Sequence, residues 1–278
     1  MTAARIPARD LDALGVRAGA TLLVHASLRR VGPAADTVLA TLLTALGPDG
    51  TLVVPAFTAG NSDTSPEFRA RTHGMTASQV AAHQAAMPPF NPRHTPSQGM
   101  GRLAEAVRRS PGAVRSTHPQ TSFAAVGARA AQLMARHDED CHLGEGSPLA
   151  RLYAADARVL LIGVGYDVCS AFHLAEYRID DPPRREYRCV VLRDGRRRWI
   201  SYQDVDLDDS DFAALGAAYE AHDAALPTPA VGRGRLGSAE TRVLPLRAAV
   251  DFATGWLAGN RPRRSTPERL QNASGFLH

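Results

Sequence analysis

Short apolar runs and a segment of helical periodicity alternate near the start of the chain. Residues 22–24 and 52–54 are continuous apolar runs bounded by turn residues, as expected for strands buried on both faces. Between them, apolar positions from 38 to 46 recur at helical spacing, Asp36 is placed to cap the helix, and residues 47–50 stop it. The pattern predicts a β-α-β unit.

The alternation continues through the middle of the chain. Helical patterns cover residues 101–109, 128–137, 148–154 and 170–177, and buried strands are predicted at 123–126 and 159–162. Ser147 is placed to cap the third of these helices. Residues 60–98 are polar and rich in Pro, His and Ser, which predicts a long functional loop.

The period of the pattern changes after residues 182–183, which are both proline. Residues 186–192 and 197–202 flank Asp194 and Gly195, a pair typical of a type I′ hairpin turn. This predicts a small antiparallel β insert near 184–202. A helix at 211–225, a Gly/Arg-rich segment at 231–237 and a helix at 247–257 follow, and residues 261–278 are expected to form a poorly ordered tail. We therefore expect one α/β domain over residues 1–260.

Charge is unevenly placed along the 278 residues. The net charge is +4 and the pI about 9.3, yet residues 199–232 contain no arginine and carry seven acidic residues. A basic protein of this kind raises the alternative of a non-catalytic nucleic-acid binder, but the acidic block and the absence of a nucleic-acid-binding motif argue against it. No apolar run approaches the roughly 20 residues of a membrane span, so a cytoplasmic, unexported protein is expected.

Several familiar signatures are incomplete. Gly163 and Gly165 follow a strand, but Val168 stands where a dinucleotide fingerprint has its third glycine. Neither a Walker A sequence nor a G-x-S-x-G elbow occurs. Residues 29–34 fit a loose R-x-x-G-x-A pyrophosphate pattern, although Pro33 removes one amide donor. Three widely spaced cysteines predict free thiols and no zinc site.

His173 and Glu176 are the leading candidates for acid–base chemistry. Their three-residue spacing on a predicted helix places imidazole and carboxylate on one face. Histidine has a pKa suited to taking a proton from an attacking amine near neutral pH. A solvated helical pair, or half of a metal site whose other ligands are missing, explains the same spacing.

Two further segments could bind anionic ligands. Residues 24–29 (VHASLR) lie at the carboxyl end of the first strand, where open α/β sheets bind ligands, and their amides with Arg29 could hold phosphates. His118, within residues 116–123 (STHPQTSF), could bind a pantetheine or phosphate group. The alternatives are an ordinary exit from the strand for the first segment and a capped turn before Pro119 for the second.

Three long blocks resemble the aminoglycoside 3-N-acetyltransferase family, also called antibiotic N-acetyltransferases. They are residues 23–32 (LVHASLRRVG), 95–125 (TPSQGMGRLAEAVRRSPGAVRSTHPQTSFAA) and 144–178 (GEGSPLARLYAADARVLLIGVGYDVCSAFHLAEYR), with a weaker match at 231–257. The resemblance implies an α/β fold built as a three-layer sandwich around a central mixed sheet. It also implies acetyl-CoA as donor, no metal, and direct transfer to an amine.

The resemblance assigns a role to each candidate residue. His173 matches the histidine of the family's H-x-A-E block and becomes the base, with Glu176 as its glutamate. The coenzyme channel is expected to be lined by His25, Ser27, Leu28, Arg29, Thr95, Ser97, Met100, Gly101, His118, Ser122 and Phe123.

The acidic stretch acquires a use because aminoglycosides are polycations. Glu220 is the best candidate for binding such an antibiotic, together with Asp167 and Asp223. Asp208, Asp209 and Asp211 could instead solvate and cap a helix. The expected function is acetylation of an aminoglycoside, at its 3-amino group, which gives resistance. A same-family transferase acting on a different amine in secondary metabolism is the alternative, and the protein could be a monomer or a homodimer.

Overall fold

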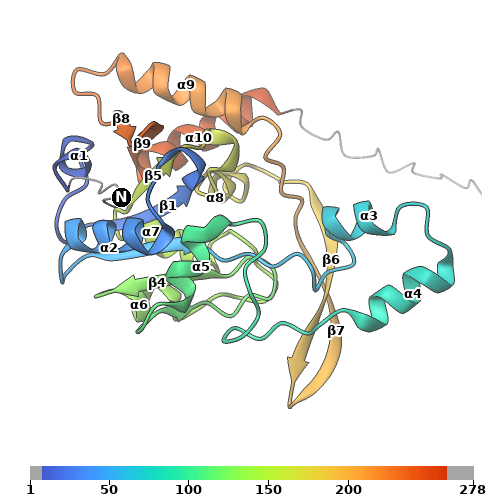
Figure 1. Ribbon diagram of the computed structural model, residues 1–278. Coiled ribbons are helices and arrows are strands. Elements are labelled where there is room, and N and C mark those ends of the chain that lie inside the picture. Colours follow the sequence, from blue (N-terminus) through green and yellow to red (C-terminus); the bar gives the residue numbers. More distant parts are fainter. Residues whose placement is uncertain (1–7, 262–278) are drawn as a thin grey trace, which may run out of the picture.

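A seven-stranded mixed sheet forms the centre of the protein, whose computed structural model describes residues 8–261 (Figure 1). The strand order is β3-β4-β2-β1-β5-β9-β8, and β1 is parallel to both β2 and β5 whereas the other pairs are antiparallel. The strands are β1 Thr21–Ala26, β2 Thr51–Pro55, β3 Val114–Arg115, β4 Phe123–Gly127, β5 Arg158–Ile162, β8 Gly232–Leu236 and β9 Ala239–Pro245. This confirms the predicted mixed sheet.

The predicted β-α-β unit is present as β1, α2 (Ala35–Leu46) and β2. The helix buries the apolar positions that its periodicity predicted and ends at Gly47, whose φ of 66° suits glycine. Asp36 does not cap it. The N-cap residue is Ala34, which has no side-chain oxygen to offer, and Asp36 lies in the first turn, where its charge favours the positive end of the helix dipole.

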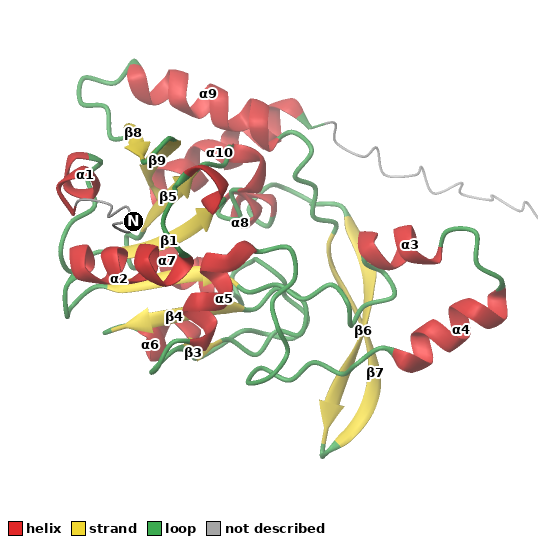
Figure 2. Cartoon of the chain, in the orientation of Figure 1, coloured by secondary structure: helices red, strands yellow, loops and turns green. Residues whose placement is uncertain are grey.

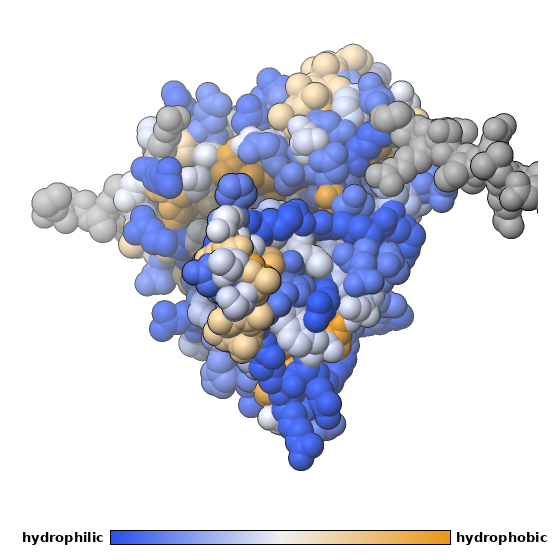
Figure 3. Space-filling model, turned by 90° about the vertical axis from the view of Figure 1, so that its right-hand side faces the viewer, coloured by the Kyte–Doolittle hydropathy of each residue, from blue (hydrophilic) through white to orange (hydrophobic). Residues whose placement is uncertain are grey.

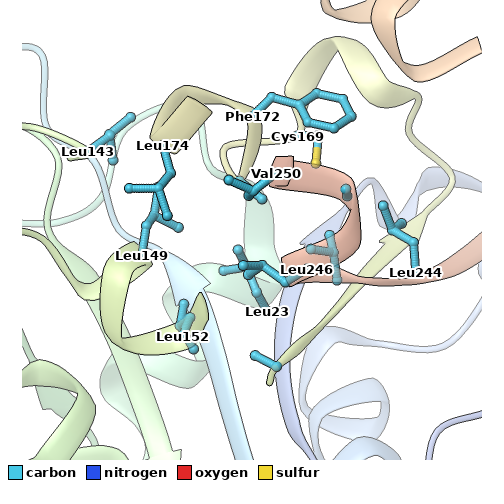
Figure 4. Close-up of a cluster of buried hydrophobic side chains, with 14 of the residues drawn as sticks. Leu23, Leu143, Leu149, Leu152, Cys169, Phe172, Leu174, Leu244, Leu246 and Val250 are labelled. Carbon is cyan, nitrogen blue, oxygen red and sulfur yellow. The ribbon is translucent and has the colours of Figure 1, made fainter. Parts of the chain in front are cut away.

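Helices cover both faces of the sheet, so the three-layer sandwich is confirmed. Strand residues such as Leu22 and Val24 pack toward one face, and their neighbour Leu23 packs toward the other, because successive strand side chains alternate. The first face carries α1 Ala8–Ala13, α2 and α5 Gly101–Arg109. The second carries α6 Ala130–Met134, α7 Pro148–Ala154, α8 Phe172–Glu176, α9 Phe212–Ala224 and α10 Leu246–Asn260. Leu23 of β1, Leu174 of α8 and Val250 of α10 belong to the buried cluster drawn in Figure 4.

The antiparallel insert is a separate two-stranded sheet made of β6 (Arg184–Arg193) and β7 (Arg196–Val205). Asp194 and Gly195 have φ values of 50° and 72°, as a type I′ turn requires. The hairpin extends away from the main sheet beside α3 and α4 (Figure 2). Isolated bridges from Ser62 to Cys189 and from Phe90 to Val191 attach the hairpin to the segment before α3 and the segment after α4.

Residues 60–98 were predicted to form one long loop, and this prediction is wrong, because they contain two helices. The first, α3 (Pro66–Thr72), is capped by Ser65, and the second, α4 (Ala77–Ala86), begins with a capping box of Thr76 and Gln79. Neither helix has a fully buried residue. Their sequences therefore lack the apolar stripe on which the helix prediction relied.

Several predicted bounds also differ from the structure. The helix predicted at 128–137 is only α6, and the Gly/Arg-rich segment 231–237 contains β8, which pairs with the unpredicted β9. Short 3₁₀ helices cover Leu28–Arg30 and Tyr166–Val168. Residues 262–278 of the predicted tail lie outside the described residues, but Arg261, assigned to that tail, is held by ion pairs to Glu176 and Asp211. No helix within residues 8–261 has the length and apolar character needed to cross a membrane.

Two glycine-to-alanine substitutions on helices should have opposite effects on stability. A Cβ at Gly216 of α9 would lie 2.0 Å from Cγ of Tyr166, whereas a Cβ at Gly255 of α10 meets nothing within 4 Å. We expect Gly216→Ala to lower the free energy of unfolding by roughly 1–3 kcal/mol through overpacking. Gly255→Ala should raise it by roughly 0.5–1 kcal/mol because alanine favours the helix. Urea unfolding measures both, and equal stability of the two variants would contradict this packing.

Candidate active site

A cavity of about 300 Å³ lies where several segments leave the central sheet. Phe57 follows β2, and His173 lies on α8, which follows β5, so both come after the carboxyl ends of parallel strands. Met100 at the start of α5 and Tyr187 of β6 form other parts of the wall. The face of the molecule that carries α3, α4 and the hairpin is mostly hydrophilic (Figure 3).

His173 and Glu176 form a hydrogen-bonded pair at this cavity. Nδ1 of His173 lies 2.5 Å from Oε2 of Glu176, as their spacing on one helix predicted. The His173 side chain is 13% exposed and that of Glu176 only 1%. When the imidazole is neutral, its Nδ1–H donates to the carboxylate, which leaves a lone pair on Nε2. The ring of Phe212 packs 4.7 Å from the imidazole and restricts its orientation.

His25, at the end of β1, is a buried neutral neighbour of His173. Burial, with a smaller contribution from the charge of His173, lowers the pKa of His25 to about 4. Its Nε2 has no hydrogen-bond partner among residues 8–261. The low pKa of His25 therefore keeps a second positive charge away from His173.

Three more histidines are buried and form a cluster at the cavity wall. The ring of His118 lies 4.7 Å from that of His137 and 4.6 Å from that of His142. Burial lowers the pKa of His137 to about 3 and also lowers the pKa values of His118 and His142. His142, which lines the cavity, is held by Asp204 at 2.8 Å.

Carboxylates also line the cavity. Glu67 of α3 and Asp209, which precedes α9, belong to its wall, together with one arginine, Arg185. Within the described part of the chain, no group of three or more His, Cys, Asp or Glu side chains is arranged to hold a metal ion. The cavity therefore combines the imidazole of His173 with carboxylates that could bind a cationic amine.

A wide groove of about 810 Å³ lies between α2 and α5, on the other side of the turn that precedes α5. Ser97, Gly101, Arg102 and Arg109 line it. Met100, between Ser97 and Arg102 in sequence, lines the His173 cavity instead. The turn at residues 97–101 thus separates the cavity that contains His173 from a groove lined by two arginines and by the carboxylates of Asp36 and Glu105.

A comparison of the sequence with models of known protein families covers nearly the whole chain and identifies its family. A family model described as aminoglycoside 3-N-acetyltransferase matches residues 23–258. The chain belongs to this acetyltransferase family. It is 37% identical to aminoglycoside N(3)-acetyltransferase VII of Streptomyces paromomycinus over 94% of this chain and 93% of that protein. The resemblance found in the sequence is confirmed.

Solved structures of acetyltransferases show the same fold. The YokD protein from Bacillus subtilis has a TM-score of 0.83 and 33% identity, covering 91% of this chain and 92% of its own. AAC-IIIb, solved as a binary complex with CoASH, has a TM-score of 0.76 and 29% identity, covering 94% of this chain and 97% of its own.

The predicted coenzyme residues of this acetyltransferase fall into an accessible group and a buried group. Arg29 is exposed, Ser27, Thr95 and Ser97 are half-buried, and Met100 and Gly101 lie at the turn between cavity and groove. His25, Leu28, His118, Ser122 and Phe123 are buried.

Three of the buried residues that were predicted to line the coenzyme channel contact residues of the cavity wall or of the segment after β2. Nδ1 of His118 accepts hydrogen bonds from the amides of Gln120 and Thr121, which do line the cavity. Ser122 donates to the carbonyl of Ala56 and accepts from Nε of Arg115. Phe123 packs edge-on against Phe57, a cavity residue.

The structure places the predicted acceptor carboxylates elsewhere. Glu220 forms ion pairs with Arg233 at 2.8 Å and Arg242 at 2.9 Å. Asp223 is buried and accepts hydrogen bonds from the amides of residues 230 and 231. Asp167 is exposed on a 3₁₀ helix, and none of the three lines the cavity. Glu220 and Asp223 therefore have partners within the fold, whereas Glu67 and Asp209 line the cavity that contains His173.

Sequence reasoning missed these two carboxylates for identifiable reasons. Glu67 belongs to the stretch 60–98, whose polar composition predicts a loop, and Asp209 stands beside Asp208 and Asp211, a pattern that also fits the cap of a helix. Only Ser65, two positions before Glu67, carried a local signal, because it is a helix N-cap.

The buried histidines should make the fold sensitive to mild acid. In the unfolded chain they bind protons near the ordinary pKa of 6.5, whereas folded His25 and His137 resist protonation down to about 4 and 3. The unfolded state therefore holds more protons below pH 6.5. Each such histidine contributes stability that is complete above that pH and is lost by roughly 1.4 kcal/mol per pH unit below it.

Urea unfolding at several pH values between 7.5 and 5 measures this loss. In His137→Gln the slope of unfolding free energy against pH should be shallower by roughly 1.4 kcal/mol per unit, because one linked proton is removed. The stability of the same variant at pH 7.5 provides the reference for its other effects. Identical slopes for the variant and the unmodified protein would show that His137 does not resist protonation in the folded state.

Proposed function

We propose that this protein transfers the acetyl group of acetyl-CoA to an amine of an aminoglycoside antibiotic, at its 3-amino position, with His173 as general base. The observation that carries the proposal is the His173–Glu176 pair at a cavity whose wall also holds the carboxylates of Glu67 and Asp209. Family membership supports it, as does the aminoglycoside N(3)-acetyltransferase VII activity named for the Streptomyces paromomycinus relative.

The coenzyme would approach through the groove between α2 and α5. Arg102 and Arg109 supply positive charge for its phosphates, and the helix N-terminus after Met100 offers free amides. The pantetheine arm would then pass the turn at 97–101 to reach the cavity, beside the segment at 27–29. The CoASH complex of the structurally similar AAC-IIIb supports coenzyme A as the carrier.

The acceptor would enter from the side of α3 and the hairpin. Aminoglycosides are polycations, so carboxylates in a partly closed cavity attract and orient them. Glu67 and Asp209 approach the cavity from two different elements, which allows two ammonium groups of one acceptor to be bound at once. Arg185 lies in the same wall and would disfavour an ammonium group beside it.

Acetyl transfer then needs one base and no covalent enzyme intermediate. The neutral amine nitrogen attacks the thioester carbonyl, its new C–N bond replaces the C–S bond, and coenzyme A leaves as the thiolate. Nε2 of His173 takes the proton that the nitrogen loses, and Glu176 stabilises the resulting imidazolium through Nδ1. Cysteine nucleophiles are poorly suited here, because burial raises the pKa of Cys141 to about 11 and those of Cys169 and Cys189 to about 12.

To identify the acceptor, acetyl-CoA turnover is measured as the release of free thiol with each member of a panel of deoxystreptamine aminoglycosides. Locating the new acetyl group by NMR establishes the position. Thiol release confined to other amines would contradict the aminoglycoside proposal and favour a same-family transferase of secondary metabolism. We propose the cytoplasm as the place of action, since acetyl-CoA is available there.

Replacing the base should abolish most of the turnover. We expect His173→Ala to lower kcat by roughly 10² to 10⁴, because general base catalysis contributes on that order. The KM for acetyl-CoA should change little, since the coenzyme is held by other residues. His222→Ala, on the exposed side of α9, serves as the control. Near-normal turnover of His173→Ala would exclude His173 as the base.

Neutralising the cavity carboxylates should weaken acceptor binding selectively. Each of Glu67→Gln and Asp209→Asn should raise the KM for the aminoglycoside by roughly 10- to 100-fold, since hydrogen bonds to charged groups contribute about 1.5–3 kcal/mol. The KM for acetyl-CoA should stay constant. Glu240→Gln is a matched control, because the Glu240 side chain is 72% exposed and does not line the cavity. An unchanged acceptor KM in both variants would place the acceptor elsewhere.

A further inference from the structure

Arg261 follows the end of α10 and makes four hydrogen bonds around the catalytic pair. Its Nη1 donates to Oε1 of Glu176 at 2.5 Å. Nε and Nη2 donate to the two carboxylate oxygens of Asp211 at 2.8 and 2.7 Å, and Nη2 also donates to the carbonyl of Asp208 at 2.5 Å. The side chain is 17% exposed. The family match ends at residue 258, three positions earlier.

Glu176 needs a permanent positive partner because its carboxylate is almost fully buried. A general base must be neutral when it takes up a proton, so at that step His173 offers no positive charge to Glu176. The amide of Asp208 donates to Oε1 at 3.0 Å, which provides one hydrogen bond but no charge. Among residues 8–261, Arg261 is the cation bound to this carboxylate. Removing it would leave a buried charge without compensation.

We propose that Arg261 is a positioning residue of the transferase: it keeps Glu176 ionised and oriented so that His173 presents its unprotonated Nε2 to the acceptor. The inference rests on the proposed function for its catalytic meaning. Asp211, which begins α9, holds the guanidinium by two bonds, so Arg261 cannot move away from Glu176 without breaking a bidentate ion pair. The carboxylate of Asp211 and the backbone carbonyl of Asp208 therefore hold the arginine against Glu176.

Arg261 balances the negative charge of Glu176 through the contact of its Nη1 with Oε1. The loss of this charge gives the test of the proposal. Without it, the pair should bind a proton at higher pH, whether that proton resides on the imidazole or on the carboxyl group. Other charged or titratable groups near His173 or in the wall of its cavity are His25, His142, Asp208, Asp209, Arg185 and Glu67.

The test compares Arg261→Gln, Arg261→Lys and the control Arg247→Gln. Arg247 also lies near the C-terminal end of the described chain, but its ion pair is with Asp156, away from the cavity. Two readouts are measured: the acid limb of kcat/KM for the aminoglycoside, and the NMR titration of the His173 ring in the protein alone. We expect Arg261→Gln to move both upward by about one pH unit and to lower kcat at neutral pH by about tenfold or more.

Arg261→Lys should restore most of the shift because the charge is kept, but not all of kcat, because lysine cannot bind Asp211 through a planar fork. Asp211→Asn provides an independent variant that loosens Arg261 without changing it, and it should reproduce a smaller upward shift. Superimposable titrations of His173 in Arg261→Gln and the unmodified protein would overturn the proposal and leave Arg261 a structural residue. Absent turnover in the unmodified protein would instead count against the proposed function, while the NMR titration still tests Arg261.

Discussion

The buried carboxylate of Glu176 is the constraint around which the active site is built. A carboxylate that is 1% exposed persists as an anion only if surrounding groups replace the water it has lost. Three elements meet that need: α8 supplies His173, the segment before α9 supplies the amide of Asp208, and the end of α10 supplies Arg261. The same bonds that keep the charge stable also fix the orientation of the base.

The central sheet brings these elements together, because successive side chains of each strand point to opposite faces and the segments after parallel strands leave the sheet at the same edge. Leu23 and Leu161 pack into the core beneath α8 and α10, while Leu22 and Leu160 pack under α1, α2 and α5. Strand β5 runs parallel to β1, and the segment that leaves its carboxyl end becomes α8. The catalytic helix is thus seated on a core whose residues are fully buried, whereas Glu67 comes from α3, which buries none. His173 is therefore held by a firmly packed element, whereas Glu67 lies on a helix that has no buried residue.

How much the sequence reveals depends on whether a residue's partners are near it along the chain. The pairing of His173 with Glu176, the Asp194-Gly195 turn and the buried strands are local patterns, and the structure contains all three. Glu220 could not be placed, because its partners Arg233 and Arg242 approach through the pairing of β8 with β9, and β9 was not predicted. The helices α3 and α4 were not predicted, because hydrophobic periodicity reveals only helices that bury one face, and neither helix has a buried residue.

The acidic stretch shows why a run of like charges in sequence does not define a binding surface. Asp204 holds His142 and Tyr177, Asp211 holds Arg261, Glu220 holds two arginines, and Asp223 accepts backbone amides. Of the seven carboxylates, only that of Asp209 is left in the cavity wall, where it stands with Glu67 from a distant part of the chain. Under the proposed function, attraction for a polycation comes from the carboxylates that line the cavity. Those charges are set by the fold, and the total charge of the segment says little about them.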